Sequence, residues 1–260
     1  SVHEPRTMSL APISRSTLFL ALGVALALAG PPEAAQESRR VGNSLGVAAL
    51  WENELYRGLD ASVTAYPFAT WRAGRFFLRG PGLGVELWAD EAWKLDAFAQ
   101  WRFDGYDAAD SDFLAGMDDR RETLDAGLAV ERKLGDYGRL ILSAAADRLG
   151  RHDGQELELQ WIYPLGRVEG QVRARWQSDA LVDYYYGVTA GEALPDRPAY
   201  EPGSGLTWSL GLLTAAPLGK RWLLFVGANI DLLPDAIQDS PIVDGSTNTR
   251  VFGALAWRFD

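Results

Sequence analysis

The chain of 260 residues contains no cysteine, which excludes disulfide bonds and thiolate metal sites. Histidine is almost absent too, with only His3 and His152. Basic residues are outnumbered, 25 Lys and Arg against 35 Asp and Glu. The resulting net charge of −10 argues against a nucleic-acid partner, which would need a basic footprint.

Long apolar runs are also lacking, apart from one near the N-terminus. Arg15 precedes an apolar stretch at residues 17–28, and small residues that suit a cleavage site follow it. The stretch is shorter than the roughly 20 residues of a spanning helix. We therefore expect residues 1–35, an N-terminal extension plus a secretory signal peptide, to be removed, and residues 36–260 to form the exported domain.

What the exported part does contain is alternation. In "RVEGQVRARWQ", residues 167–177, charged or polar side chains alternate with apolar ones, a period typical of a β-strand. Comparable patterns predict about twelve strands, near residues 43–51, 60–72, 74–80, 83–89, 93–104, 121–133, 138–149, 154–164, 167–177, 205–216, 221–231 and 249–259.

The connections between these segments fall into two classes. Every second connection is short, as in "LGDYG" and "PLGK", whereas the intervening ones include the long stretches 105–120, 178–204 and 232–248. Short periplasmic turns and long external loops are characteristic of outer-membrane barrels. The sequence therefore predicts an all-β fold, a closed antiparallel transmembrane β-barrel of about twelve strands in the outer membrane, in contact with its lipid.

Orientation follows from the cost of charge in lipid. An arginine that faces lipid at the bilayer centre costs about 2–4 kcal/mol, so the charged row should line the interior. A soluble barrel would reverse this arrangement, but twelve strands enclose too wide a space for small apolar side chains to fill. The expected lumen-facing residues are Glu156, Glu158, Arg167, Glu169, Arg173 and Arg175. They could form either a salt-bridged plug or a selectivity lining.

Several motifs support a family resemblance. They are "GRFFLRGPGLGVEL", "DFLAGMDDRRETLDAG", "DYYYGV", "RPAY", "DSPIVD" and "AWRF", in this order from residue 74 to residue 259. With them the chain resembles the MipA/OmpV family from about residue 41 to its end. The resemblance implies an outer-membrane barrel. It also implies, for the name-giving branch (MltA-interacting protein), a scaffold that binds a membrane-bound lytic transglycosylase and a bifunctional penicillin-binding protein in peptidoglycan metabolism. Other members are described as porin-like or adhesin-like, and no catalytic, cofactor or metal residues carry over.

Three of these motifs lie in predicted external loops. Their residues of interest are Asp183, Tyr184, Tyr185, Tyr186, Gly187, Tyr200, Asp239, Ser240 and Pro241. Exposed loops often carry a binding surface, yet the tyrosines would also suit an aromatic girdle or an inward-folded lid. The acidic residues between Asp107 and Asp119 could hold Ca²⁺, but their spacing does not match an EF-hand, so a solvated external loop is the favoured interpretation.

An enzyme is the alternative from another functional class. A Ser–His mechanism, as in a lipid-modifying outer-membrane enzyme, would have to use His152, and no serine lies in an obvious position beside it. A single histidine in a loop is usually exposed. We therefore expect a non-enzymatic scaffold of the cell envelope without cofactors, with a narrow porin for small solutes as the runner-up.

Overall fold

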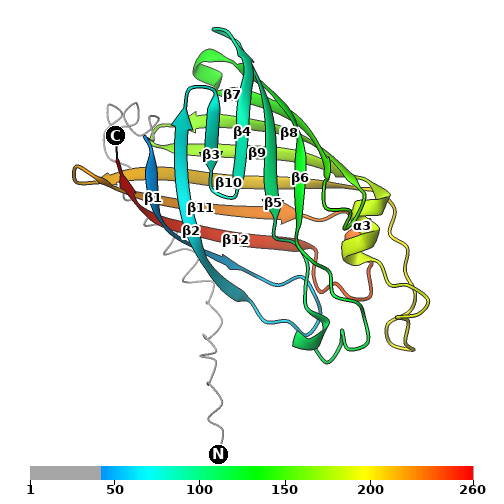
Figure 1. Cartoon of the computed structure of the whole chain (residues 1–260). Helices are drawn as coiled ribbons and strands as arrows, with labels where there is room; N and C mark the ends of the chain where they lie inside the picture. The colour runs from blue at the N-terminus through cyan, green and yellow to red at the C-terminus, as the bar shows by residue number, and fades with distance from the viewer. Residues whose placement is uncertain (1–41, 260) are drawn as a thin grey trace, which may run out of the picture.

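The computed structural model describes residues 42–259, which form one closed barrel of twelve antiparallel strands (Figure 1). The strands are β1 (Ser44–Glu52), β2 (Ser62–Ala73), β3 (Phe76–Arg79), β4 (Gly82–Ala89), β5 (Trp93–Arg102), β6 (Thr123–Lys133), β7 (Arg139–Asp147), β8 (Gln155–Leu165), β9 (Val168–Gln177), β10 (Gly205–Leu218), β11 (Trp222–Leu232) and β12 (Thr247–Arg258). The short helices are η1 (Ala108–Asp110), η2 (Gly135–Tyr137), α3 (Asp179–Tyr186) and α4 (Asp235–Gln238). The predicted fold class is confirmed, and the predicted signal peptide lies outside the described residues.

Each strand pairs with its neighbours in the sequence, and β1 pairs with β12 to close the cylinder. The register of this closing pair runs from Ser44 opposite Arg258 to Glu52 opposite Arg250. The pairing of β1 with β12 satisfies the edges of the first and last strands, which would otherwise present unpaired backbone groups.

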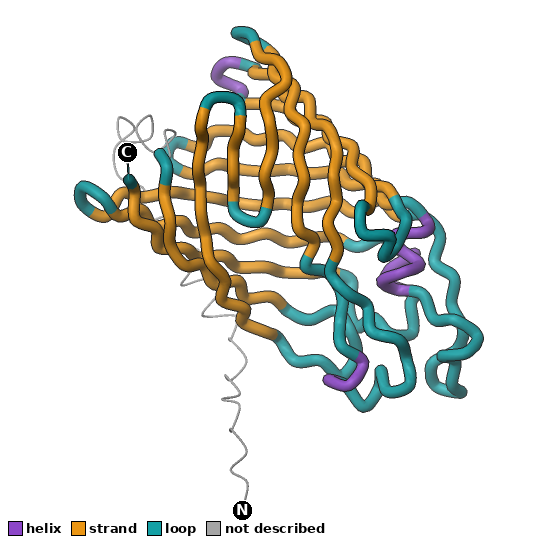
Figure 2. The backbone as a smooth tube through the Cα atoms, viewed as in Figure 1, coloured by secondary structure: helices purple, strands orange, loops and turns teal. Residues whose placement is uncertain are grey.

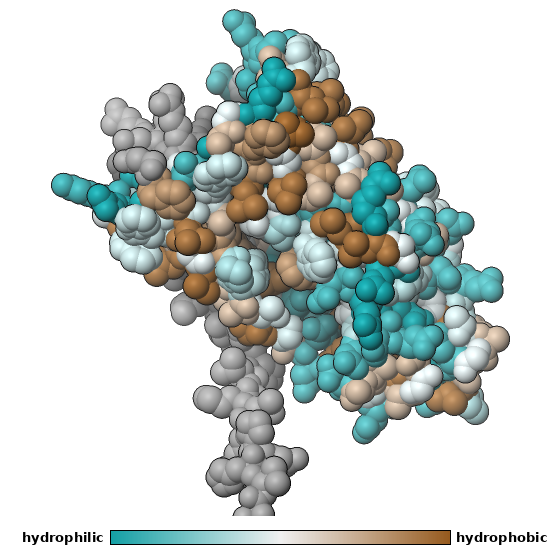
Figure 3. All heavy atoms as spheres, viewed as in Figure 1, coloured by the Kyte–Doolittle hydropathy of each residue, from teal (hydrophilic) through white to brown (hydrophobic). Residues whose placement is uncertain are grey.

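The outer face of the barrel is apolar. Leu157, Trp176 and Leu206 are paired across β8, β9 and β10 and are 40–45% exposed. The alternate residues of β9, among them Arg173 and Arg175, are only partly exposed and make hydrogen bonds within the lumen. Figure 3 shows apolar side chains over the barrel wall and hydrophilic ones gathered toward the long loops. The apolar face of the alternating strand β9 therefore points outward, as predicted, and its charged face points into the lumen.

Connection lengths are sorted between the two ends. At the turn end, connections are tight, and Gly166 and Gly219 adopt the positive φ angles of 67° and 76° that such turns require. At the loop end lie the connections after β1, β5, β7, β9 and β11, together with α3 and α4. Among residues 42–259, no helix has the length and apolarity needed to cross a membrane.

The β3–β4 hairpin departs from this pattern. Its turn at Gly80 and Pro81 lies in the middle of the wall rather than at the loop end (Figure 2). Strand β3 pairs only with Thr70–Ala73 of β2, and β4 pairs with β5 no further than Gln100. Within the described chain, β2 residues 62–69 therefore have a strand partner on the β1 side alone. We call the gap in the wall between β2 residues 62–69 and the end of β5 the notch.

Candidate functional site: the barrel lumen and its external cap

Ion pairs cross the interior of the barrel near the loop end. Arg102, at the end of β5, lies 2.7 Å from Asp125 on β6 and 2.9 Å from Glu156 on β8. It also lies 3.1 Å from Asp104, and its side chain is 10% exposed. Because β6 and β7 separate β5 from β8 in the wall, the pair with Glu156 reaches across part of the lumen.

Arg250 on β12 extends this network. Its guanidinium lies 3.0 Å from Glu52, 3.3 Å from Asp231 and 3.4 Å from Asp104. Strands β1 to β4 lie between β12 and β5 in the wall, so the pair with Asp104 also joins distant parts of the cylinder. We call the two arginines and their carboxylate partners the lumen network.

The predicted lumen residues divide between two levels. Arg175 lies 3.1 Å from Glu158 and 3.9 Å from Glu156, which places these three in or beside the lumen network. Arg173 donates to the Gln171 side chain at 3.1 Å.

Glu169 lies nearer the turn end, 3.1 Å from Arg139, and Arg167 lies in the turn before β9. Sequence reasoning missed Arg102, although polar alternation along residues 94–102 carries the necessary signal.

The loops above this network pack into a common apolar core, here called the cap. The cluster buries Tyr56 from the loop after β1, Leu114 from the loop after β5, Val188 from the loop after β9 and Ile242 from the loop after β11. The Tyr56 and Tyr106 rings lie 4.5 Å apart in an edge-to-face arrangement. Burial raises the pKa of Tyr106 to about 12, so its hydroxyl is neutral at physiological pH. Loops that share a core form an ordered lid rather than independent solvated segments.

A buried arginine joins two of these loops. Arg197 is 1% exposed, and its guanidinium donates to the backbone carbonyls of Phe113, Ala115 and Glu192. Arg120 completes the connection with two hydrogen bonds of 3.0 and 3.1 Å to the Glu192 carboxylate. The loops after β5 and β9 are therefore held together by directional bonds as well as by apolar contact.

A sequence model of the family described as MltA-interacting protein MipA matches residues 45–259. The chain belongs to the MipA family. It is 28% identical over 249 residues to the MltA-interacting protein of Escherichia coli strain K12, which covers 93% of this chain and 98% of that one.

Other relatives are named as outer membrane proteins. Identity is 29% over 226 residues to the putative outer membrane protein YiaT of Escherichia coli O157:H7, covering 83% and 90% of the two chains. It is 30% over 158 residues to outer membrane protein OmpV of Vibrio cholerae, covering 59% and 61%. This MipA-family chain is an outer-membrane β-barrel, so its loop end faces outward and its turn end faces the periplasm.

The motif residues of the MipA-family chain meet in the cap. "DYYYGV" is largely the helix α3, which the sequence analysis treated as loop. Tyr185 is 1% exposed, the Tyr184 hydroxyl accepts from the Arg121 amide at 2.9 Å, and the Ser240 hydroxyl donates to the Tyr186 carbonyl at 2.6 Å. The tyrosines thus point into the lid.

Other motif residues have distinct positions. A Cβ atom at Gly187 would lie 2.5 Å from the Asp183 carbonyl oxygen, so only glycine fits there. The Tyr200 hydroxyl donates to the Ala236 carbonyl at 3.1 Å. Pro241 is partly buried, whereas Asp183 and Asp239 are exposed on the cap surface.

One group of side chains has metal-ligand spacing among the described residues: Asp125, Asp147 and His152. The Asp147 carboxylate already accepts hydrogen bonds from Thr123 and from the amides of the loop that follows β7. The His152 Nδ1 accepts from the Gly154 amide at 2.9 Å, which leaves the proton on Nε2, the atom that faces Asp125 at 3.4 Å. The Asp147 carboxylate is therefore occupied by the protein's own bonds, whereas Asp125 Oδ1 and His152 Nε2 are buried and face only each other.

The same geometry corrects one expectation. His152 was expected to be exposed, but its side chain is 1% exposed and lies beneath the Tyr184 and Tyr185 rings. The reason is the helix α3, which the sequence analysis did not identify. No serine hydroxyl within residues 42–259 forms a recorded hydrogen bond to this imidazole.

Glu192 makes the cap sensitive to acid. Burial acts to raise the pKa of Glu192, but hydrogen bonds from the Asp118 and Thr189 amides and the Arg120 charge outweigh burial and lower it. A carboxyl whose pKa is lowered by folding contributes stability above its unfolded pKa, about 4.3, and loses it as pH falls through the folded value.

We expect the cap to be well protected at pH 7 and to loosen below about pH 4. Glu192→Gln should lower cap protection at pH 7 by about 1–3 kcal/mol and flatten this acid dependence. Amide hydrogen exchange of residues 105–122 measures both. The exposed Glu201→Gln in the same loop is the matched control. An identical response of the two variants would contradict the assignment.

Proposed function

We propose that this chain is a non-enzymatic scaffold of the cell envelope that binds a lytic transglycosylase, and with it a penicillin-binding protein, at its periplasmic end. The observation that carries the proposal is the lumen network, because ion pairs between distant strands occupy the space a solute would cross. The name of the Escherichia coli relative, MltA-interacting protein, supports a transglycosylase partner. A lipid deacylase activity lost in His152→Asn would contradict the non-enzymatic part.

The turn end offers a small surface for such a partner. Tyr137 in η2 is 68% exposed, and Lys220 is exposed in the β10–β11 turn. Aromatic side chains are enriched among the residues that dominate interface energetics, so Tyr137 is the proposed centre of the contact and Lys220 in a separate turn extends it.

The test is binding of a purified lytic transglycosylase from the same organism to the immobilised barrel. Tyr137→Ser combined with Lys220→Glu should weaken binding by about tenfold or more. Asp112→Asn, an exposed change on the cap, should leave binding unchanged. Equal binding by all three proteins would remove the turns from the proposal, and no binding by the unmodified barrel would overturn the scaffold.

The narrow porin is the second candidate. A cavity of about 800 Å³ at the turn end favours it, since part of the lumen is hollow. The lumen network and the cap lie across the other half. We therefore expect purified barrel in planar bilayers to show no reproducible channels at neutral pH. Stable, uniform conductance steps would favour the porin over the scaffold.

A further inference from the structure

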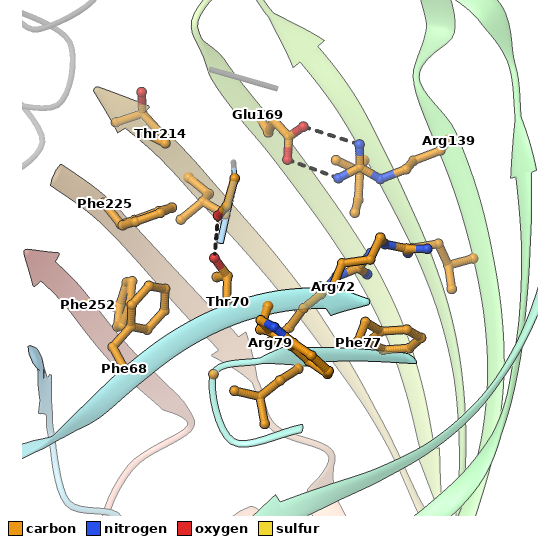
Figure 4. Close-up of a pocket in the computed structure, with 18 of the residues that line it drawn as sticks. Phe68, Thr70, Arg72, Phe77, Arg79, Arg139, Glu169, Thr214, Phe225 and Phe252 are labelled. Atoms are coloured by element: carbon orange, nitrogen blue, oxygen red, sulfur yellow. Dashed lines mark hydrogen bonds and ion pairs between the residues drawn. The ribbon is translucent and has the colours of Figure 1, made fainter. Parts of the chain in front are cut away.

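The cavity at the turn end has two chemically different walls. Phe68, Phe225 and Phe252 gather on one side, with the Phe68 ring 5.0 Å from Phe225 and 5.8 Å from Phe252 (Figure 4). Arg72 and Arg79 lie on the other side. An apolar wall that faces a cationic wall suits a ligand with both characters.

The cationic wall is only partly neutralised. Arg139 lies 3.1 Å from Glu169, and Arg72 lies 3.1 Å from Glu86. Arg79 is exposed to the cavity, and its guanidinium lies 4.8 Å from the centre of the Phe77 ring. Within residues 42–259, no carboxylate lies within ion-pair distance of Arg79. The cavity therefore presents one guanidinium available to an anion.

The notch borders this cavity. Tyr66 on its β2 edge and Gly80 and Pro81 at its base all line the cavity. The Gly80 amide donates to the Ala69 carbonyl at 2.9 Å, so the odd-numbered residues of β2 direct their backbone groups toward the notch. Pro67 is one of these residues. Because proline has no backbone N–H, the edge of the notch has one fewer unpaired donor.

Apolar side chains line the edges of the notch. Val63, Ala65 and Pro67 are exposed on β2, and Phe103 is 55% exposed after β5. The Tyr66 and Phe103 rings stack at 6.1 Å between the two edges. Unpaired backbone is costly in lipid. At this level of the wall β3 and β4 are missing, and the contact between the Tyr66 and Phe103 rings takes their place. Rotation of these two side chains alone would therefore open the wall.

We propose that the cavity binds a single-chain anionic amphiphile, an alkyl chain with a carboxylate or phosphate head, which reaches it from the outer leaflet through the notch. The head group pairs with Arg79, and the chain lies against Phe68, Phe225 and Phe252. The volume of about 800 Å³ lies within the range of small-molecule sites. This binding is independent of the transglycosylase scaffold, so either proposal can fail alone.

Binding is tested by calorimetry on the full barrel in neutral detergent with three ligands. Dodecyl phosphate should bind, whereas dodecyltrimethylammonium, with the same chain and opposite charge, and butyl phosphate, with the same head and a short chain, should bind at least about tenfold more weakly. Arg79→Gln should weaken dodecyl phosphate binding by about tenfold or more. Arg75→Gln, an exposed arginine in the neighbouring turn, should not. Equal affinity for the cationic ligand, or no effect of Arg79→Gln in a folded barrel, would overturn the site.

The route is tested separately with a variant that carries Tyr66→Cys and Phe103→Cys. Because the natural chain has no cysteine, a bifunctional thiol reagent can join only these two positions. Cross-linking should slow uptake of dodecyl phosphate from vesicles at least tenfold and leave its final affinity unchanged. Unchanged uptake would show that the amphiphile arrives from the periplasm and would overturn access through the notch.

Discussion

Arg102→Ala is expected to lower the free energy of unfolding of the barrel by about 3–5 kcal/mol. Among residues 42–259, Arg102 is the cation nearest to Asp104, Asp125 and Glu156, at 3.1, 2.7 and 2.9 Å, whereas Arg250 and Arg175 lie 3.4 Å from Asp104 and 3.9 Å from Glu156. Removing one partner of a buried ion pair leaves the other charge uncompensated in a poorly solvated place, which costs more than the pair contributes. Urea titration of the barrel in lipid vesicles, followed by tryptophan fluorescence, measures the loss.

The matched control is Arg72→Ala. This arginine pairs with Glu86 on the barrel wall, but its side chain is 43% exposed, so we expect a change below about 1 kcal/mol. Acid should reduce the difference between Arg102→Ala and the unmodified chain. Burial acts to raise the pKa of Asp104, but Arg102 and Arg250 outweigh it and lower the pKa, so the stability Asp104 contributes is present above about pH 4 and lost below it. Equal destabilisation by the two variants would show that the lumen network is not a structural plug.

Arg197→Ala is expected to release the cap while the barrel stays closed. Three backbone carbonyls, those of Phe113, Ala115 and Glu192, would lose a buried charged donor. At about 1–3 kcal/mol for each unsatisfied buried group, the local free energy of opening should fall by at least about 3 kcal/mol. Limited proteolysis in residues 105–120 should then become about 100-fold faster, because cleavage follows the population of the open cap.

Arg121→Ala provides the comparison. Its side chain is 63% exposed and lies 3.5 Å from Asp119, a surface pair that contributes little. Proteolysis of this variant should match that of the unmodified chain. If Arg197→Ala were cleaved no faster than Arg121→Ala, the cap core alone would hold the loops, and the role assigned to Arg197 would be wrong.

The barrel could be predicted because its information is local. Alternation in residues 154–177 identifies β8 and β9, and the short connection between them sets their register. The cost of placing Arg173 and Arg175 in lipid then fixes which face points inward. These inferences need neighbouring residues only, and the structure agrees with each predicted strand to within a few residues.

The site depends on distances that no local pattern contains. The pair between Arg250 and Asp104 requires the curvature of the closed cylinder, which strand register alone does not give. The helix α3 was missed because three consecutive tyrosines dominate its sequence, although Leu181, Val182 and Tyr185 have helical spacing and are its buried residues. The notch was also not predicted, although the segments 74–80 and 83–89 are shorter than the roughly ten residues of a spanning strand.

The pairing of β1 with β12 determines the order of assembly. Its nine residue pairs join positions about 200 residues apart in the chain, so this seam cannot form while the last strand is still absent. Contacts of such long sequence separation form slowly. Until they form, the partly folded sheet keeps two unpaired strand edges that can pair with other chains. Closure of this seam is therefore expected to be the last step of barrel formation, and the two edges stay exposed until it takes place.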